Sequence, residues 1–339
     1  MEPEKVRAPN IRDVAAQAGV SYQTVSRVLN DSPSIKPSTR ERVLDVIREL
    51  GYRPNQAART LVTSRSRTIG VLSANSSALY GPTTAINSIE KSAREAGYRL
   101  SITNINTGDY ASIKSGLDYL LSQSVEAIVV IAPQARVFDV INDLSIHVPF
   151  VTLEATGRNP GHNLSVDQIG GARLATKHLI DLGHTELMHI SGPQDWIEAE
   201  ARMQGFLHEV NAADLRTRAP ILGDWSAHFG YYAGLELLKF RDFTAVFAGN
   251  DQMALGFIHA CRDLGLDVPG DISVVGFDDI PEAAHFYPPL TTVRQDFAEV
   301  GRRAVAFLLA ELDGSEHSTD AAIPPELVLR ASTARLTAR

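Results

Sequence analysis

Three polar side chains close to the N-terminus, those of Tyr22, Gln23 and Arg27, are suited to contact the base edges of DNA. A phenol, an amide and a guanidinium carry donors and acceptors that match the base edges in the major groove. Helical spacing within Ser21–Asn30 puts all three on one face, and the opposite face is apolar. That apolar face is formed by Val25, Val28 and Leu29. Because so short a helix gains little stability alone, its apolar face must pack on another segment.

The segment on which it packs is Ile11–Val20, whose apolar residues recur at helical spacing. Gly19 can end this first helix, because glycine tolerates a positive φ, and Ser21 can cap the second. Two short helices joined in this way, with a polar outer face on the second, indicate a helix-turn-helix motif. An ordinary helical hairpin with a polar surface is the alternative.

A third helix is predicted to begin at Pro37, where the missing N–H costs nothing, and to end at Gly51. After it, Pro54 disfavours helix at the residue before it, and Asn55 can cap a short helix over 56–62. That helix has no apolar stripe long enough to fold alone, so we expect a partner to order it.

The charge of the chain is divided between two regions. Residues 1–67 carry 12 Lys/Arg and 7 Asp/Glu, a net charge of +5, whereas the whole chain of 339 residues carries −8. Residues 68–339 therefore carry 20 basic and 33 acidic side chains, a net charge of −13. A basic N-terminal region on an acidic body indicates that nucleic acid meets only the N-terminal region, although such a bias can also be a solvated surface and no more.

Other features of the composition restrict the class of protein. A single cysteine, Cys261, excludes an internal disulfide framework and suits a reducing compartment. The chain has no apolar core of a signal peptide and no run of about 18 apolar residues. We therefore expect a cytoplasmic, nucleoid-associated protein with no membrane partner. No glycine-rich phosphate loop is found, and no cofactor is expected.

From residue 68 onward, short apolar runs alternate with helical patterns. Strands that alternate with helices are typical of an α/β body with a mostly parallel sheet. The predicted strands are Ile69–Leu72, Leu100–Ile102, Ala127–Ile131, Phe150–Leu153, Leu187–Ile190, Ala245–Ala248 and Ser273–Phe277. The predicted helices include Ala85–Ala96, Gly170–Leu182, Ala199–Val210 and Asp251–Leu264.

Residues 9 to about 335 resemble the LacI/GalR family of bacterial repressors. The resemblance rests on Tyr-Gln-Thr-Val-Ser-Arg at 22–27, Gly-Asp-Trp-Ser-Ala at 223–227 and Asn-Asp-Gln-Met-Ala-Leu-Gly at 250–256. The stretches at 271–279 and 288–297 extend it almost to the C-terminus. Matches in the same order along one chain are highly specific, whereas any single one would be weak.

This resemblance implies an α/β fold in which a helix-turn-helix headpiece precedes a periplasmic-binding-protein-like body of two doubly wound parallel-sheet subdomains. The headpiece would span 1–54, a hinge helix and linker 55–67, and the effector-binding and dimerisation domain 68–339. Subdomain one would be about 68–163 plus 295–323, and subdomain two about 164–294 plus 324–339. The effector would bind between them, at the carboxyl ends of the strands.

For DNA, the resemblance assigns base reading to Tyr22, Gln23 and Arg27, and the guanidinium of Arg27 suits a guanine. The side chains that would hold phosphates and set the register are Ser21, Thr24, Asn30 and Thr39. The hinge-helix residues assigned to DNA are Asn55, Ala58 and Leu61. Of these, Leu61 would wedge into the minor groove at the centre of a two-fold site. The implied partners are a palindromic double-stranded operator and a second copy of the chain in a homodimer.

The residues that the resemblance assigns to the effector have the chemistry of a sugar site. Sugars present hydroxyls in fixed directions and apolar C–H faces, which suit carboxylates, amides, a guanidinium and a flat aromatic. The assigned residues are Leu79, Pro82, Glu154, Trp196, Arg202, Trp225, Asn250, Asp278 and Gln295. For three of them a structural role is open, because Asp278 and Asn250 could cap loops and Trp225 could belong to the core.

At several positions of the implied effector site, the chain differs from the family sequence that it otherwise resembles. Trp196 and Glu198 replace serines, Val166 replaces a phenylalanine, Ala85 replaces an isoleucine, and one residue is inserted before Leu79. A second tryptophan indicates a pocket with two stacking faces or with an altered shape. We expect a galactoside or another pyranoside as the effector, and an oligosaccharide remains open.

The dimer contact that the resemblance implies is formed by Thr84–Ala96 and Asp251–Leu264, with Leu255 and Phe286, although an apolar helix face can equally be core. The sugar would change the angle between the subdomains and release the DNA, which makes the protein a repressor of carbohydrate-utilisation genes. A corepressor-dependent regulator, or a sugar-binding protein without a DNA role, are the alternatives.

Two other classes of protein, enzymes and metal-binding proteins, can be compared with the residues of this chain. Asp278–Asp279, or Asp224 with Glu154, could form a glycosidase acid pair, but no local arrangement supports one. The histidines within 178–189 straddle a helix, a loop and a strand without metal-ligand spacing. We therefore expect no enzyme activity, no catalytic residues and no metal.

Overall fold

The computed structural model describes residues 9–30, 32–53, 65–73, 80–105, 110–132, 134, 137, 140–141, 146–153, 162–315 and 322–336. The chain divides into two compact units, Met1–Ser66 and Arg67–Arg339. Each unit has its own hydrophobic core.

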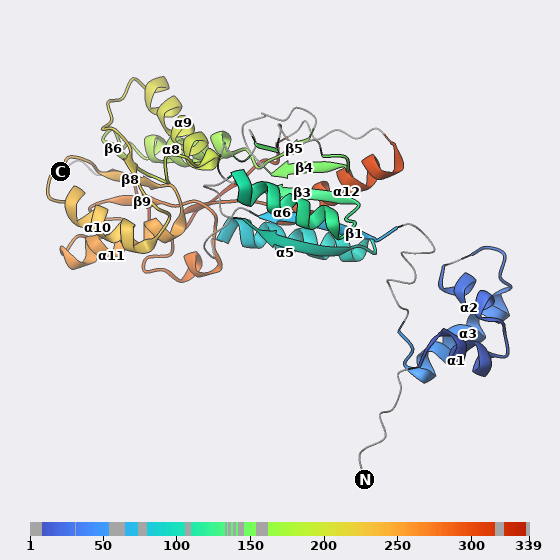
Figure 1. Ribbon diagram of the computed structural model, residues 1–339. Coiled ribbons are helices and arrows are strands. Elements are labelled where there is room, and N and C mark those ends of the chain that lie inside the picture. Colours follow the sequence, from blue (N-terminus) through green and yellow to red (C-terminus); the bar gives the residue numbers. More distant parts are fainter. Residues whose placement is uncertain are drawn as a thin grey trace, which may run out of the picture. The chain divides into compact units, whose positions relative to one another are not determined.

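The described part of the N-terminal unit consists of α1 (Ile11–Ala18), α2 (Tyr22–Leu29) and α3 (Pro37–Leu50) (Figure 1). Helix α1 ends at Gly19, which has a φ of 65°. Glycine adopts this left-handed conformation without strain because it has no Cβ. The apolar faces of the three helices meet in a small core whose most buried members are Val14, Val25 and Val43. The predicted helix-turn-helix motif is confirmed. The predicted hinge helix over 56–62 lies outside the described residues.

The first sheet of the C-terminal unit is parallel and has the strand order β2-β1-β3-β4-β5. Its strands are β1 (Thr68–Ser73), β2 (Arg99–Asn104), β3 (Ala127–Ile131), β4 (Phe150–Leu153) and β5 (Asn163–Leu164). Its helices are α5 (Tyr80–Glu95), α6 (Tyr110–Ser122) and α12 (Phe297–Asp313). Helices α5 and α12 share a hydrophobic core on one face of the sheet, and α6 packs on the other.

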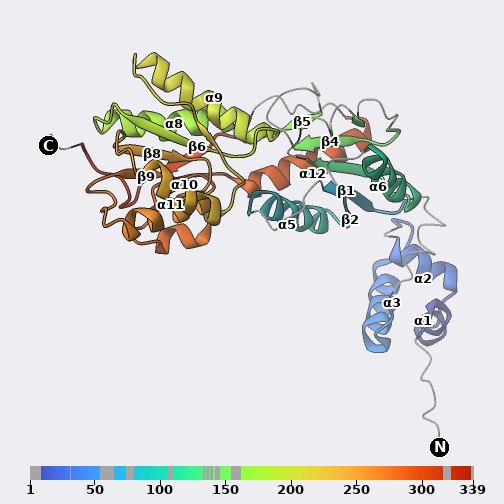
Figure 2. The same cartoon turned by 60° about the vertical axis from the view of Figure 1, so that its left-hand side comes forward.

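Helix α12 returns to this sheet from far along the chain. It lies beside α5 in both views (Figures 1 and 2). Gly301 permits the contact, because a Cβ there would come within 2.5 Å of the backbone of Ser88. The C-terminal part of the chain therefore completes the layer that covers the first sheet.

The second sheet is also parallel, with the order β7-β6-β8-β9. Its strands are β6 (Leu187–Ser191), β7 (Ile221–Leu222), β8 (Ala245–Ala248) and β9 (Ser273–Val275). Its helices are α8 (Gln168–Asp181), α9 (Ile197–Ala212), α10 (Ala227–Leu237) and α11 (Asp251–Asp263). Helices α8 and α9 cover one face, and α10 and α11 the other (Figure 1). A short 3-10 helix, η1 (Pro281–His285), follows β9.

Strand β10 (Thr292–Arg294) precedes α12 in the chain, and β11 (Glu326–Val328) follows it. The two strands pair with each other in an antiparallel manner. The predicted α/β class, with a helix-turn-helix unit and a periplasmic-binding-protein-like body, is thus confirmed. The last predicted strand ends earlier than expected, at Val275. The chain turns there, because Asp278 and Asp279 take φ values of 107° and 51°.

Candidate functional site

The outer face of α2 carries the three side chains that the sequence assigns to base reading. Ser21 caps the helix, since its hydroxyl accepts a hydrogen bond from the backbone N–H of Thr24 over 3.1 Å. With the apolar face of α2 turned into the core, Tyr22, Gln23 and Arg27 are all exposed, and Tyr22 retains 55% of its surface. A phenol, an amide and a guanidinium are therefore accessible together on one short helix.

The other predicted DNA contacts differ in their placement. Asn30 follows the last residue of α2 and is exposed, and Thr39 lies half-buried in the first turn of α3. The predicted hinge residues Asn55, Ala58 and Leu61 lie outside the described residues.

A cavity of about 850 Å³, counting the space at its mouth, opens in the C-terminal unit. One wall is apolar and comes from α5, the ends of β3, β4 and β5, and the start of α12. The other wall carries the polar groups and comes from α8, α9 and the loops around α11. The predicted effector residues that line the cavity are Pro82, Trp196, Arg202, Trp225, Asn250, Asp278 and Gln295. Leu79 and Glu154 lie outside the described residues.

Four buried side chains close a ring of hydrogen bonds at the polar wall. Arg202 Nε donates to Gln168 Oε1 over 2.9 Å, and Gln168 Nε2 donates to Gln295 Oε1 over 2.7 Å. Gln295 Nε2 donates to Asp278 Oδ1 over 2.8 Å, and Arg202 Nη2 donates to the same oxygen over 3.3 Å. No member of this ring is more than 8% exposed. The ring therefore holds its donors and acceptors in fixed directions, as recognition of oriented hydroxyls requires.

The ring contains a buried ion pair. Burial raises the pKa of Asp278, and the positive charge of Arg202 opposes that increase. Burial also lowers the pKa of Arg202, which the carboxylate of Asp278 opposes. The guanidinium carbon of Arg202 lies 3.8 Å from the ring centroid of Phe277 and 5.4 Å from that of Trp225. Arg202 is thus held in one orientation by a carboxylate, an amide and two aromatic rings.

Trp225 is positioned by two glycines and by Asn250. Its backbone has a φ of 70°, which is rare for a bulky residue. A Cβ on Gly192 would overlap with the indole, and one on Gly249 would lie 3.3 Å from it. Asn250 Nδ2 donates to the backbone carbonyl of Trp225 over 3.0 Å, and its Oδ1 caps α11 by accepting from the N–H of Met253. Asn250 is therefore a helix cap and also supports the cavity wall.

Trp196 lies directly before α9 and is half-buried. Its ring meets that of Trp225 edge-on, with centroids 5.7 Å apart and planes at 65°. Its backbone pairs with that of Gln134, which follows β3 in the first sheet. Glu198, in the first turn of α9, also lines the cavity. The two indoles consequently offer faces of different orientation.

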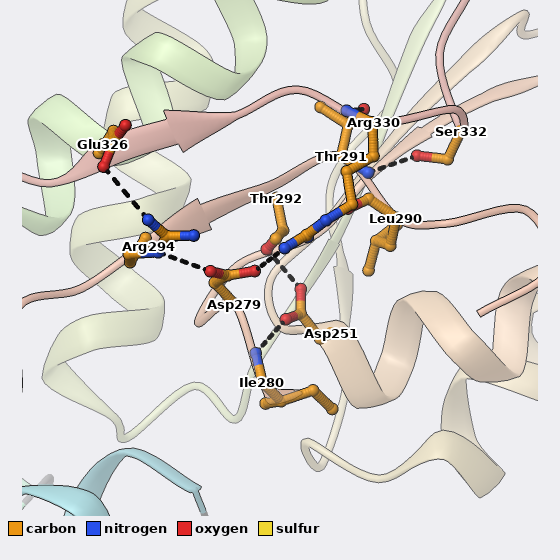
Figure 3. A network of polar contacts seen from close by, with 10 residues as sticks. All are labelled: Asp251, Asp279, Ile280, Leu290, Thr291, Thr292, Arg294, Glu326, Arg330 and Ser332. Atoms are coloured by element: carbon orange, nitrogen blue, oxygen red, sulfur yellow. Dashed lines mark hydrogen bonds and ion pairs between the residues drawn. The ribbon is translucent and has the colours of Figure 1, made fainter. Parts of the chain in front are cut away.

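Next to the ring, Asp279 anchors the cavity loop to the C-terminal strand pair (Figure 3). It accepts hydrogen bonds from Arg294 Nε over 2.7 Å and from Arg330 Nη2 over 2.6 Å. Arg330 also donates to the backbone carbonyl of Leu290 over 2.7 Å. The carboxylate that follows Asp278 in sequence is therefore neutralised by two arginines and is structural.

Asp251, at the start of α11, is fully buried in the same network (Figure 3). Its carboxylate accepts hydrogen bonds from the hydroxyl of Thr292 over 2.5 Å and from the backbone N–H of Ile280 over 2.9 Å. Burial raises its pKa well above the usual value, and the charge of Asp278 raises it further. These bonds join the first turn of α11 to β10, which fixes the loop that carries Asp278.

Several residues that line the cavity could not be identified from the sequence, among them Gln168, Tyr80 and Phe297. Gln168 is the first residue of α8, directly after its capping residue Asp167, and completes the hydrogen-bonded ring. Tyr80 and Phe297 meet edge-on, with ring centroids 6.2 Å apart, and line the apolar wall. The capping aspartate marks the start of α8 in the sequence, but nothing there shows that Gln168 faces Arg202.

The residues of the alternative site classes are engaged elsewhere. His178 and His184 hydrogen-bond to hydroxyl side chains, and His189 Nδ1 lies 2.9 Å from the backbone carbonyl oxygen of Phe247. Asp224 accepts hydrogen bonds from the residue two positions after it. In the part of the chain that the structure describes, no cluster of three or more His, Cys, Asp or Glu residues could hold a metal ion. Likewise, none of the described helices is long and apolar enough to cross a membrane.

A helix-turn-helix unit joined to a two-sheet body with a buried polar cavity defines a DNA-binding regulator with a ligand-binding domain. Residues 10–55 match the family of bacterial regulatory proteins of the lacI type, and residues 176–333 match a periplasmic binding protein-like domain. The lactose operon repressor of Escherichia coli (strain K12) is 33% identical over 323 residues, which cover 95% of this chain and 89% of the repressor. The transcriptional regulator CelR of Thermobifida fusca is 35% identical over 92% of this chain and 94% of its own. The chain therefore belongs to the lacI family of bacterial regulatory proteins and is a DNA-binding transcriptional repressor.

Solved structures agree with this assignment. The lac repressor dimer bound to operator and the anti-inducer ONPF matches with a TM-score of 0.87 and 32% identity, over 97% of this chain and 100% of that chain. The complex of the regulator CelR with cellobiose matches with a TM-score of 0.72 and 30% identity, over 96% and 99%.

Proposed function

We propose that this repressor controls carbohydrate-utilisation genes and is released from a palindromic operator by a small pyranoside, such as a galactoside, bound in the cavity. The observation that carries the proposal is the buried ring of Arg202, Gln168, Gln295 and Asp278. It presents oriented donors and acceptors on one wall, whereas the facing wall is apolar. A sugar ring, with hydroxyls at its edge and C–H groups on its faces, has the matching chemistry.

The bound ligands of two relatives support a sugar-like effector. One lac repressor structure contains ONPG and another the anti-inducer ONPF, and the CelR structure contains cellobiose. In the proposal for this chain, Arg202 and Asp278 hold hydroxyls, Asn250 and Gln295 add amide contacts, and the indole of Trp225 lies against a C–H face. The remaining contacts would come from Leu79, Pro82, Glu154 and Trp196.

On the DNA side, the proposal assigns base contacts to Tyr22, Gln23 and Arg27. Their joint exposure on α2 supports it. The residues proposed to hold phosphates are Ser21, Thr24, Asn30 and Thr39. The hinge residues proposed to bind in the minor groove are Asn55, Ala58 and Leu61. In this division 1–54 is the headpiece, 55–67 the hinge and linker, and 68–339 the effector-binding and dimerisation domain.

A palindromic operator requires two headpieces, so the repressor is proposed to act as a homodimer. Helices α5 and α11 supply the proposed contact. Leu255 on α11 is 40% exposed and is available to a second copy. Phe286 is 8% exposed and packs in the core of the second sheet, so it offers little surface to a second copy.

Binding and release are linked through the angle between the two subdomains. A ligand that favours one angle over the other changes the geometry at the start of the body and so the affinity for DNA. We propose that the ligand is an inducer, so that its binding lowers the affinity of the repressor for DNA. A corepressor, which has the opposite sign, is the second candidate, because a ligand between the subdomains can favour either of the two angles.

The proposal is tested by selecting bound duplexes from a pool of random inverted repeats at low salt, followed by gel-shift titration with a panel of pyranosides. We expect one palindromic sequence to be enriched and one sugar to release it. Arg27→Ala should weaken binding by roughly 1–3 kcal/mol and relax sequence choice. Arg48→Ala, which removes an exposed arginine paired with Asp45 on α3, is the matched control and should retain the sequence choice.

The ligand side is tested with Arg202→Ala and Asp278→Asn, and Tyr232→Ala on the exposed side of α10 is the control. Both cavity variants should abolish sugar-induced release, and the control should not. Tighter DNA binding on addition of sugar would refute induction in favour of corepression. Failure to prefer any inverted repeat over random duplex would refute the proposed operator.

A further inference from the structure

We propose that Ile197 is a positioning residue for the response to the effector. It holds the start of α9 against the opposite half of the body, and this contact separates when the angle between the two halves changes. The inference rests on the proposed function, since it names the contact through which a bound effector acts on that angle. Gln134, Trp196 and Ile197 form the contact and constitute a latch between the halves.

Helix α9 covers the second sheet, but its first residue is buried in the core of the first. Phe206 and Val210 of α9 belong to the cores of the second sheet, and so does Ala199, two residues after Ile197. Ile197 itself is buried in the hydrophobic core between α6 and the first sheet, where Val137 is another member. Because this burial removes apolar surface from water, it holds the two halves of the body together.

A backbone contact lies beside this apolar one. Trp196 pairs in an antiparallel manner with Gln134, a buried residue that follows β3 in the first sheet. The segments in which the chain crosses between the sheets are elsewhere, and two of them pair with each other through Val166 and Ile323. A change of angle between domains is absorbed by a few residues of such crossing segments. The latch is not part of them, so a change of angle separates its two sides.

The latch is continuous with the wall of the cavity. Trp196 and Glu198, the neighbours of Ile197 in the sequence, line the cavity, whereas Ile197 points into the opposite core. All three belong to the start of α9, so an effector that displaces Trp196 or Glu198 displaces Ile197 with them. Ile197 therefore influences the response without touching the effector.

The first experiment measures the opening of the latch by the reactivity of a thiol in the full chain. Ile197→Cys is combined with Cys261→Ser, and its reaction with Ellman's reagent is compared with that of the wild-type protein, whose single thiol, Cys261, is buried in the core of the second sheet. Each rate is divided by the rate of the same thiol in the urea-unfolded chain. A contact that opens without global unfolding exposes its thiol more often than a stable core does, so we expect the latch thiol to react at least about tenfold faster than Cys261. Equal rates would overturn the latch.

The second experiment repeats the labelling with saturating operator duplex and with the sugar that releases it. An inducer and the operator favour different angles between the halves, so one should slow the reaction of the latch thiol and the other should speed it, by at least about threefold. Neither should speed the reaction of Cys261 in the wild-type protein, which is the control. Labelling of the latch thiol that neither partner changes would overturn its coupling to the response.

The third experiment separates a positioning role from general damage. Ile197→Ala should shift the affinities for operator and for sugar in opposite directions, at least one of them by about tenfold or more, and Ile197→Val should shift them less. Ile169→Ala, at an exposed isoleucine of α8, is the matched control and should shift neither. A loss of both affinities in Ile197→Ala would overturn the positioning role.

Failure of the proposed function gives a different result. If the wild-type protein binds the operator more tightly with sugar, induction fails, and both partners should then change the labelling of the latch thiol in the same direction. If no sugar acts, the sugar-responsive function fails, and the effect of the operator on the latch thiol alone decides: a change of at least about threefold supports the latch, and an unchanged rate overturns it.

Discussion

Removing the charge of Arg202 should lower the stability of the protein, because it leaves the buried carboxylate of Asp278 without its charged partner. The side chains of Arg202 and Asp278 are both buried. Arg202→Met retains most of the volume and the contacts with Phe277, but it leaves the carboxylate with only Gln295 as a partner. Breaking a buried ion pair by removing one member costs about 3–5 kcal/mol, so we expect the free energy of unfolding to fall by that amount at pH 8.

The loss should depend on pH in a defined direction. In the variant only the hydrogen bond from Gln295 still opposes the effect of burial, so the pKa of Asp278 rises further than in the wild-type protein. The native state then retains a proton that the unfolded chain has released, and stability falls as the pH rises from the ordinary aspartate pKa toward the raised one. The destabilisation is therefore expected to be smaller at pH 5 than at pH 8.

The measurement is urea unfolding followed by tryptophan fluorescence and by far-UV circular dichroism at both pH values. The double variant Arg202→Met/Asp278→Asn removes both charges and should recover more than half of the loss, which gives a favourable coupling energy between the two sites. A loss below about 1 kcal/mol at pH 8, or no recovery in the double variant, would refute the reasoning that the ion pair is buried and coupled.

Three further predictions follow from single buried groups. Gly192→Ala should displace the indole of Trp225, because the new Cβ would overlap with it. The fluorescence maximum should shift, and sugar binding should weaken about tenfold or more. Unchanged fluorescence and affinity would contradict the close packing. Burial lowers the pKa of His189 to about 4, so the protein should lose stability as the pH falls from about 6.5 to 4. In thermal melts over that pH range, the melting temperature of a His189→Gln variant should change less with pH than that of the wild-type protein. Burial raises the pKa of the Cys261 thiol to about 12, so Ellman's reagent at pH 8 should modify it only after denaturation, and rapid reaction of the native protein would show that the thiol is accessible.

The helix-turn-helix unit could be predicted from the sequence because its determinants are local. Gly19, which ends α1, and Ser21, which caps α2, lie two residues apart, and the apolar spacing of each helix can be counted directly. Strands such as β3 and β8 could also be predicted, because each is a short run of apolar residues. What periodicity could not supply is the length of β9, since the chain turns at Asp278 and Asp279 through positive φ values that aspartate adopts only in context.

The polar wall of the cavity could be predicted only in part. Arg202 and Asp278 were found through the resemblance to a family, but their partner Gln168 was not. Gln168 meets Arg202 34 positions later in the chain and Gln295 127 positions later, so the contacts depend on the order of strands in the sheets. The same holds for Asp279, whose neutralisation by Arg330 requires the last strand to return beside the cavity loop.

The return of the last strand has a consequence for biosynthesis. The core of the N-terminal unit uses only residues that leave the ribosome early. The loop that carries Asp278 is anchored by Arg330, and the hydroxyl of Ser332 accepts a hydrogen bond from the backbone N–H of Thr291 (Figure 3). Ser332 also donates to the backbone carbonyl of Val274. At about 5–20 residues per second, the interval between the two is on the order of tens of seconds. A nascent chain therefore has a folded headpiece before it has a finished cavity. A message truncated ahead of β11 would yield a protein with a complete headpiece core and a cavity loop that lacks its anchor at Arg330.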